Sequence, residues 1–292
     1  MSLTTDSFEF VADLVRRRSA IQLEAGKEYL VESRLAPLAR RAGLGLDEFV
    51  KSVRAAASEH ERDLVVEALT TNETSWFRDG APFVALRQHI VPALTADAVA
   101  PRRLRVWSAA CSTGQEPYSI AMTLQDALPS HVDADILATD LSEQVLARAR
   151  AGLYSQLEVD RGLPSAMRER HFQAAGSEWR ISDELRAAVR FMRHNLLDAS
   201  PAGQGFDLIF LRNVLIYFDV ATKQQILARM HRVLRPGGFL VLGAAETTIG
   251  VDDDWERLPL GRGSVYRPRG AASDPPPWPA TVPTPFGSGA PR

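Results

Sequence analysis

The stretch VWSAACSTGQEPYSIAMTL, residues 106–124, decides the fold because it predicts a buried strand, a tight loop and then a helix. In α/β proteins a nucleotide is usually held at such a loop. The loop has one glycine, Gly114, whereas dinucleotide folds use three to bring the backbone close to a pyrophosphate. A loop with one glycine, small or polar neighbours and Pro117 in the first helical turn suits a ligand without phosphates, such as S-adenosylmethionine (SAM).

The same alternation of strand and helix continues along the chain. Helices are predicted over 117–128, 142–151 and 221–234, and the last of them stops at RPGG. Alternating strands and helices predict an α/β fold, with a doubly wound, mostly parallel sheet of the Rossmann-like kind. The strand-length apolar runs are LRVWSAA (104–110), DILATD (135–140), VRFMRHN (189–195), FDLIFLRN (206–213) and GFLVLGAA (238–245).

Residues 152–188 are too long for a simple crossover and predict an inserted subdomain with a small antiparallel hairpin unit. Residues 1–75 show only helical periodicity, in segments near 6–18, 24–42, 46–57 and 59–69, with Pro37 as a possible kink. The predicted domains are a helical domain (1–78), a helix and linker (79–101), a SAM-binding domain (102–267) and a Pro-rich, disordered tail (268–292).

Composition excludes several other classes of protein. The formal net charge of −2 lacks the broad positive field of a nucleic-acid binder. A single cysteine, Cys111, excludes an intrachain disulfide, and the six histidines show no metal-ligand spacing. No apolar run approaches the length of a membrane span and the N-terminus has no signal pattern, so a cytoplasmic protein is expected.

Polar residues follow the predicted strands, where a ligand is expected. Glu116 would pair with the ammonium of a methionine moiety, or it is a solvated acid in the first turn of the helix. Asp140 would accept two ribose hydroxyls, or it caps the next helix in competition with Ser142. Asn195 and Leu196 would contact an adenine, although a leucine at such a position is more often part of the core.

Two further segments complete the candidate site. Arg212 and Asn213 end the fourth predicted strand, and the Asn/Asp-Pro-Pro-aromatic motif of enzymes that methylate nucleobase amino groups is absent there. The segment TTNETSWFRDGAPF (70–83) places Asn72, Thr74 and Arg78 beside two aromatic residues. A helix end with an apolar anchor is the simpler interpretation of this segment.

Together these motifs resemble the chemotaxis receptor methyltransferases, the CheR family, over roughly residues 8–267. The resemblance rests on TTNETSWFRD, VWSAACSTGQEPYSIA, ILATDLS, RHNLLD, LRNVLIYFD and LRPGGFLVLGAAET, in the family's order and spacing. It implies an N-terminal helical domain, a SAM-binding sheet with a small inserted β subdomain, and SAM as cofactor with S-adenosylhomocysteine as product. The cofactor contacts that it implies are Asn72, Thr74, Arg78, Glu116, Asp140, Asn195, Leu196, Arg212 and Asn213.

The resemblance also implies the reaction, which is methylation of the γ-carboxylate of glutamates on the cytoplasmic helices of chemoreceptors. Arg78 and Tyr217 match positions beside the transferred methyl group. A glutamate is already ionised at neutral pH, so the reaction requires alignment rather than a general base. Competing interpretations are a dehydrogenase, a SAM-dependent enzyme for another protein or a small-molecule carboxylate, and a SAM-binding scaffold of a signalling array.

The enzyme is expected to be a monomer, and two further expectations concern how it binds the receptor. Lys27, Arg34 and Arg41 repeat every seven residues and form one basic stripe, which is a candidate dock for an acidic receptor helix or merely a solvated helix edge. Some family members hold a peptide from the receptor C-terminus on the inserted subdomain. The loop QAAGSEW (173–179) is short for that pattern, which predicts weak or no tethering.

Overall fold

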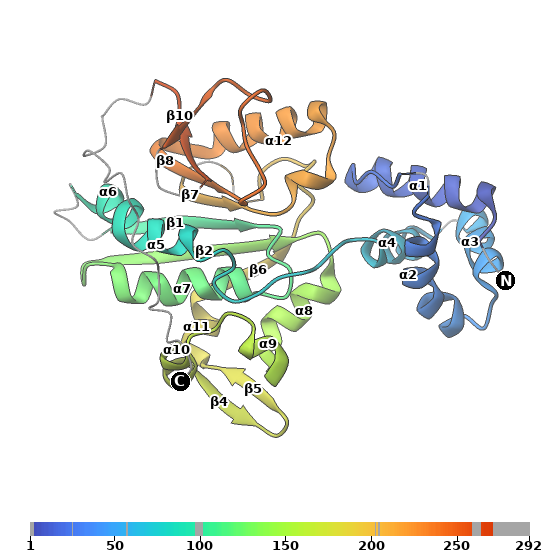
Figure 1. Cartoon of the computed structure of the whole chain (residues 1–292), viewed down its shortest axis with the longest axis horizontal. Helices are drawn as coiled ribbons and strands as arrows, with labels where there is room; N and C mark the ends of the chain where they lie inside the picture. The colour runs from blue at the N-terminus through green and yellow to red at the C-terminus, as the bar shows by residue number, and fades with distance from the viewer. Residues whose placement is uncertain are drawn as a thin grey trace, which may run out of the picture. The chain divides into compact units, whose positions relative to one another are not determined.

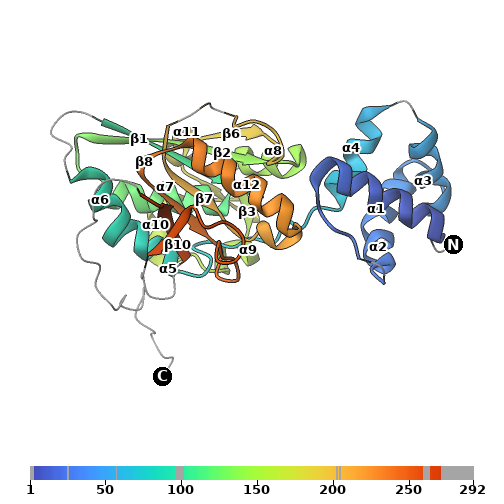
Figure 2. The ribbon, with the colours of Figure 1, turned by 90° about the horizontal axis from the view of Figure 1, so that it is seen from above.

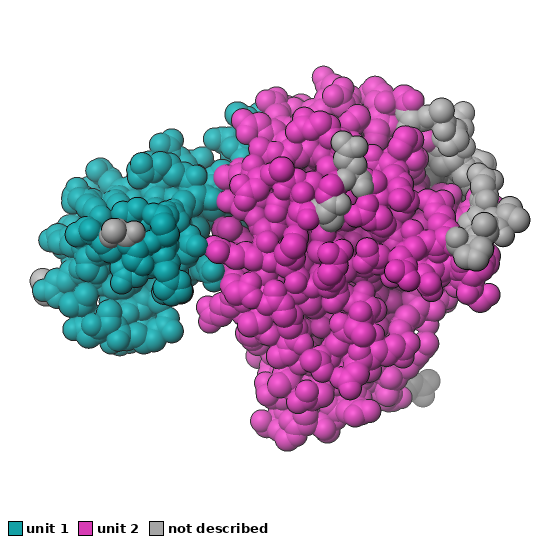
Figure 3. All heavy atoms as spheres, turned by 180° about the vertical axis from the view of Figure 1, so that it is seen from behind, with its two compact units in different colours: residues 1–71, 217–223 teal, residues 72–216, 224–292 magenta. Residues whose placement is uncertain are grey.

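The computed structural model describes residues 3–24, 26–56, 58–96, 102–201, 203, 205–258 and 264–270. The chain divides into two compact units, one of Met1–Thr71 with Tyr217–Lys223 and one of Asn72–Ile216 with Gln224–Arg292 (Figure 3). The sequence predicts a boundary at residue 78, whereas the contacts divide the chain after Thr71. The reason is that Trp76 and Phe77 are buried in the core of the second unit.

The first unit contains four helices in its described part: α1 (Thr5–Ser19), α2 (Glu28–Arg41), α3 (Leu46–Ala55) and α4 (Glu59–Ala68) (Figure 1). Thr4 caps α1 by accepting a hydrogen bond from the Ser7 backbone N–H. Asp47 of α3 accepts hydrogen bonds of 2.6 Å from both the Thr4 and the Ser7 hydroxyls, which ties α3 to the start of α1. α2 begins at Glu28 rather than Glu24 and runs through Pro37.

The second unit is built on a seven-stranded sheet in the order β6-β2-β1-β7-β8-β10-β9. The pairs β6–β2, β2–β1, β1–β7 and β7–β8 are parallel, so the predicted doubly wound α/β sheet is confirmed. β10 and β9 add an antiparallel edge that the sequence does not predict. The strands are β1 (Arg102–Ala109), β2 (Val132–Asp140), β6 (Val189–Arg193), β7 (Phe206–Leu211), β8 (Leu234–Leu242), β9 (Trp255–Leu258) and β10 (Ser264–Pro268).

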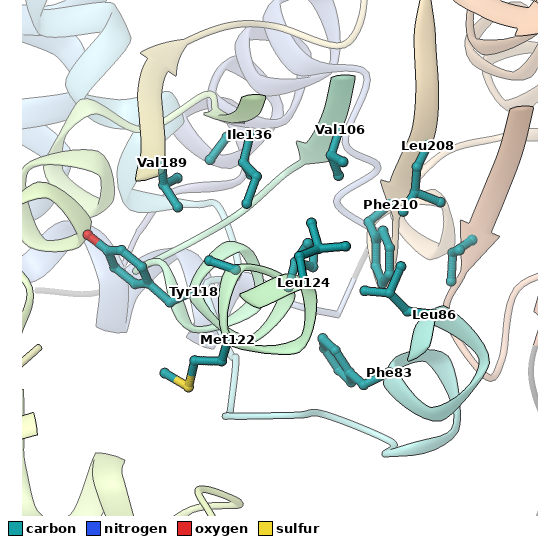
Figure 4. Close-up of a cluster of buried hydrophobic side chains, with 14 of the residues drawn as sticks. Phe83, Leu86, Val106, Tyr118, Met122, Leu124, Ile136, Val189, Leu208 and Phe210 are labelled. Atoms are coloured by element: carbon teal, nitrogen blue, oxygen red, sulfur yellow. The ribbon is translucent and has the colours of Figure 1, made fainter. Parts of the chain in front are cut away.

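Helices cover both faces of this sheet. α12 (Val220–Val233) lies on the face opposite to α7 (Gln115–Ala127) and α8 (Glu143–Ala151) (Figure 1). Side chains of β1, β2, β6 and β7 point toward α7 and toward the segment that carries Phe83 and Leu86 (Figure 4). That segment contains the helix predicted within residues 79–101, and the structure divides it into α5 (Ala81–Ala85), a π-helical turn (Leu86–Ile90) and α6 (Val91–Thr95).

The insertion between α8 and β6 forms the small antiparallel unit that the sequence predicts. Its three-stranded sheet has the order β3-β5-β4, with β5 in the middle. β4 and β5 are labelled in Figure 1, and β3 is labelled in Figure 2. Its elements are β3 (Leu153–Ser155), α9 (Gln156–Asp160), α10 (Ser165–His171), β4 (Phe172–Ala175), β5 (Glu178–Ile181) and α11 (Asp183–Ala188). Most of the predicted disordered tail, residues 271–292, lies outside the described residues.

Candidate active site

A buried arginine joins three loops at the carboxyl ends of the central strands. Arg212 follows β7, and its side chain is only 1% exposed. Its Nη1 donates to Glu116 Oε2 at 3.0 Å, at the start of α7. Its Nη2 donates to Asp79 Oδ2 at 2.7 Å and to the Arg78 carbonyl at 2.8 Å. The network therefore connects the segment before the sheet with the loops after β1 and β7.

Glu116 is a buried carboxylate whose pKa is raised above the ordinary value of a glutamate. Burial raises its pKa, whereas the Arg212 guanidinium and the Ser108 hydroxyl lower it. Its Oε1 accepts a hydrogen bond of 2.8 Å from Ser108 Oγ at the end of β1. Because the helix start that carries Glu116 packs against these partners, the interpretation as a solvated first-turn acid does not hold.

Asp140 ends β2 and is 8% exposed. Its Oδ2 accepts from the Ser112 N–H at 2.8 Å and its Oδ1 from the Ser142 N–H at 3.0 Å. The cap of α8 is Ser142, whose hydroxyl accepts from the Val145 N–H. Asp140 therefore does not cap the helix, and instead it fixes the loop after β1.

The loop after β1 leaves no room for a side chain at its glycine. Gly114 has a φ of 96°, and a Cβ there would lie 2.9 Å from the Ala149 Cβ and 3.0 Å from Tyr154 Oη. Tyr154, which lies on β3 of the inserted subdomain, donates a hydrogen bond of 2.9 Å to the Thr113 carbonyl. The inserted subdomain thus supports the loop directly.

The segment 72–79 is anchored on the same loop. The Asn72 carbonyl accepts a hydrogen bond of 2.8 Å from Ser112 Oγ. Trp76 packs edge-to-face on Tyr154, with ring centroids 4.9 Å apart. Arg78 donates from Nη1 to the Glu73 carbonyl at 2.7 Å. The two aromatic residues of this segment therefore anchor it in the core, and the polar residues stay at the surface of the unit.

A pocket of about 340 Å³ opens beside this segment. It collects polar side chains from the segment, from the loop after β1, from α8 and from the inserted subdomain. Its lining includes Asn72, Thr74, Thr113, Gln115, Gln144 and Arg148. Two predicted cofactor residues, Asn72 and Thr74, therefore share one pocket with the loop that was expected to hold the ligand.

The remaining cofactor residues follow β6 and β7. Asn195 accepts a hydrogen bond of 3.1 Å from the Leu197 N–H, and Leu196 is 9% exposed. Asn213 has a φ of 58°, in the left-handed region that non-glycine residues rarely adopt. Glu246, which accepts backbone hydrogen bonds from the loop of Asn213, was not predicted from the sequence. An acidic residue directly after the last apolar run, in LGAAET, was the available signal.

The other predicted residues belong to the first unit. The Tyr217 carbonyl accepts from the Gln22 N–H at 3.2 Å. Lys27 pairs with Glu24 at 3.0 Å, and Arg41 is exposed. Arg34 donates to the Thr70 carbonyl, to the Ala68 carbonyl at 3.4 Å and to Thr71 Oγ1 at 3.3 Å, so it closes the end of α4.

Two family models match the chain on either side of the division between the units. The CheR methyltransferase all-alpha domain matches residues 6–70, and the CheR methyltransferase SAM binding domain matches residues 72–262. The chain belongs to the CheR methyltransferase family. The resemblance inferred from the motifs is confirmed, and SAM as the cofactor with it.

The sequences of curated relatives align with this CheR protein over nearly their full length. Chemotaxis protein methyltransferase 1 of Pseudomonas aeruginosa is 40% identical, over 91% of this chain and 99% of the relative. Chemotaxis protein methyltransferase Cher2 of Pseudomonas putida is 39% identical over the same shares. A chemotaxis protein methyltransferase of Vibrio parahaemolyticus is 37% identical, over 91% of this chain and 98% of the relative. The chain is thus a SAM-dependent methyltransferase of the chemotaxis type.

The residues at the CheR site fit the cofactor chemically. The buried Glu116 carboxylate suits an ammonium, and the Arg212 Nε is buried without a hydrogen-bond partner in the described structure. The described residues include no cluster of three or more His, Cys, Asp or Glu that could bind a metal. Across the same residues, no helix has the length and apolarity that crossing a membrane requires.

Proposed function

We propose that this protein transfers the methyl group of SAM to the γ-carboxylate of glutamates on the cytoplasmic helices of chemoreceptors, as a cytoplasmic monomer. Bound SAM supplies an electrophilic methyl group on a sulfonium. One observation carries the choice of a carboxylate acceptor. The site segments 72–79, 108–116 and 212–217 contain arginine but no histidine or lysine. An amine acceptor must lose a proton, and these segments lack histidine, the base whose ordinary pKa lies nearest neutrality, whereas a glutamate with a pKa near 4.3 is already nucleophilic.

The cofactor end of the site is assigned from its chemistry. Glu116 holds the ammonium of the methionine moiety, and Asp140 accepts the ribose hydroxyls. Asn195 and Leu196 would contact the adenine. Four polar residues, Asn72, Thr74, Arg212 and Asn213, complete the contacts of the methionine end. The buried Arg212 network supports this assignment because it already brings a carboxylate and a guanidinium to one place.

The acceptor end depends on alignment. Arg78 holds the glutamate carboxylate in line with the methyl group through charge-assisted hydrogen bonds. Tyr217 orients the methyl group. Attack joins a negative and a positive charge into two neutral products, so a site that excludes water accelerates it.

The test uses SAM labelled on its methyl group and a purified cytoplasmic receptor fragment. We expect label on the fragment that mild base releases as methanol, because carboxyl methyl esters hydrolyse and N-methyl groups do not. A fragment with its acceptor glutamates changed to glutamine is the matched control. Arg78→Ala should lower kcat and leave SAM affinity within a few-fold. Base-stable label, or label on small molecules alone, would contradict a receptor glutamate as acceptor.

Receptor docking is tested separately on the basic stripe, which consists of Lys27 just before α2 and of Arg34 and Arg41 within it. Arg34 closes α4, so its reversal would perturb the helical unit, and Lys27→Glu with Arg41→Glu is the cleaner change. We expect a higher KM for the receptor, a weaker dependence of the rate on salt, and an unchanged affinity for SAM. An unchanged receptor KM would reduce the stripe to a solvated helix edge.

A further inference from the structure

Glu246, in the loop after β8, is buried and makes an unusual set of hydrogen bonds. It is 6% exposed. Its Oε1 accepts from the N–H groups of Val214 at 2.8 Å and Leu215 at 2.7 Å. Its Oε2 accepts from the N–H groups of Asn213 at 2.8 Å and Gly243 at 2.7 Å. One side chain thus satisfies four backbone donors from the loops after β7 and β8.

These bonds act where the backbone is strained. Asn213 has a φ of 58°, in the left-handed region, which asparagine tolerates better than most residues but which is still uncommon, and the four bonds stabilise it there. Gly243 is packed against the same group, since a Cβ there would lie 2.6 Å from Glu246 Oε2 and 2.9 Å from the Asn213 nitrogen. The carboxylate and the glycine together hold the loop that begins with Arg212 and Asn213.

We infer that Glu246 is a positioning residue for the cofactor site, which fixes Arg212 and Asn213 in the geometry that binds SAM. The inference rests on the proposed placement of these two residues at the methionine end. Glu246 does not need to contact SAM, because it acts through the peptide groups of the residues that do.

Glu246 also acts on Glu116 through its charge. It raises the pKa of Glu116, after burial as the larger cause. The charged or titratable groups around Glu116 are Arg212 after β7, Glu246 after β8 and Cys111 after β1, with Asp79 behind Arg212. Loss of the Glu246 charge therefore lowers the pKa of Glu116, and the affinity for a ligand ammonium persists to lower pH.

The informative variant is Glu246→Gln, which keeps the shape but replaces one acceptor oxygen with an NH₂ donor. That donor faces two backbone N–H groups, so the pair of bonds on one side is lost. Asp207→Asn is a matched control. Asp207 is 1% exposed and accepts from the Arg105 N–H at 2.8 Å and from Arg102 at 2.6 Å. It lies at the start of β7, about 16 Å along the strand from Arg212.

The measurement is calorimetric binding of S-adenosylhomocysteine to the full chain across pH, beside denaturation of each variant. We expect Glu246→Gln to raise the Kd at least about tenfold and to move the acid limb of the pH profile to lower pH. Asp207→Asn should lose stability but keep the Kd within about twofold. An unchanged Kd in Glu246→Gln, or an equal rise in both variants, would overturn the inference.

Gly243→Ala keeps the inference testable if Glu246→Gln does not fold. Its Cβ separates Glu246 from Asn213, so the Kd should rise in the same direction, and an unchanged Kd would again overturn the inference. Binding of S-adenosylhomocysteine needs no acceptor. A wild-type protein that binds it but methylates no receptor glutamate would therefore refute the proposed function and leave the role of Glu246 standing.

Discussion

Glu116→Gln is the sharpest single test of the site. The glutamine can still accept from Arg212 at the present 3.0 Å and donate to Ser108 Oγ at the present 2.8 Å. The change therefore removes a charge and little else. A hydrogen bond to a charged partner contributes about 1.5–3 kcal/mol. At 1.4 kcal/mol per tenfold, the Kd for SAM should rise about 10- to 150-fold.

The pH dependence of binding gives this prediction a sign. Burial raises the pKa of Glu116, and only the ionised form binds an ammonium. As the pH is lowered, the wild-type affinity for SAM should therefore begin to decrease already above the ordinary glutamate pKa of about 4.3. The variant has no carboxyl at this position and should not show this decrease. A carboxyl whose folded pKa is raised stabilises the fold below its unfolded pKa and loses that contribution as pH rises through the folded pKa. At neutral pH the variant should thus be as stable as the wild type or more stable, since Arg212 keeps Asp79.

Calorimetry with two ligands separates the site from a general disturbance. SAM carries the ammonium, whereas methylthioadenosine has the same nucleoside without the amino acid. The variant should lose affinity for SAM and keep its affinity for methylthioadenosine. Equal losses for both ligands, or no loss for SAM, would refute the pairing of Glu116 with the ammonium.

The other predictions address the supports of the site, the helical unit and the subdomain. Tyr154→Phe removes the 2.9 Å bond to the Thr113 carbonyl, so stability should fall by about 1 kcal/mol and the SAM Kd should rise, as measured by denaturation and calorimetry. Asp140→Ala should weaken S-adenosylhomocysteine more than a ligand without ribose hydroxyls; equal weakening would leave Asp140 only its role in the loop. Hydrogen bonds, first from Lys51, lower the pKa of Asp47. Asp47→Asn should therefore destabilise the protein at neutral pH, and the difference from wild type should shrink only as pH falls below about 3.9. Receptor C-terminal peptides should bind weakly or not at all to the inserted subdomain, because its loop 173–179 is short; tight, saturable binding that deletion of this segment abolishes would contradict this.

The parallel core of the fold was predictable because β7 and the second halves of β1 and β2 are buried and appear as short apolar runs between helical segments. The edge strands β9 and β10 were not predicted, since they have four and five residues and lack a long apolar run. The π-helical turn at Leu86–Ile90 spans only five residues, and over this length the pattern of apolar residues does not distinguish it from an α-helix. Short elements of this kind depend on tertiary contacts rather than on local pattern.

The sequence identifies candidate site residues, but it does not predict which of them form ion pairs and hydrogen bonds with one another. Arg212 and Glu116 lie far apart in sequence, and no pattern indicates that they form a buried pair. Arg34 repeats with the basic stripe, yet the structure uses it to close α4. The role of Glu246 leaves no pattern in the sequence. Its partners are backbone N–H groups, which every residue type except proline carries. Sequence identifies side chains, whereas these connections depend on the path of the backbone.

Backbone strain and buried carboxylates coincide at this site for a physical reason. In the described part of the chain, six non-glycine residues have positive φ, and five of them lie on the site loops: Phe77, Asp79, Ala110, Ser112 and Asn213. Such conformations cost about 1–3 kcal/mol each and persist only when other contacts enforce them. Asp140 accepts from the Ser112 N–H, Glu246 from the Asn213 N–H, and Asp79 pairs with Arg212. A strained turn aims its peptide groups and side chains in directions that regular structure does not allow, and a buried carboxylate holds it there. A cofactor that loses its charge on methyl transfer needs this fixed arrangement of charge, since a loop that relaxed would lose the alignment on which the reaction depends.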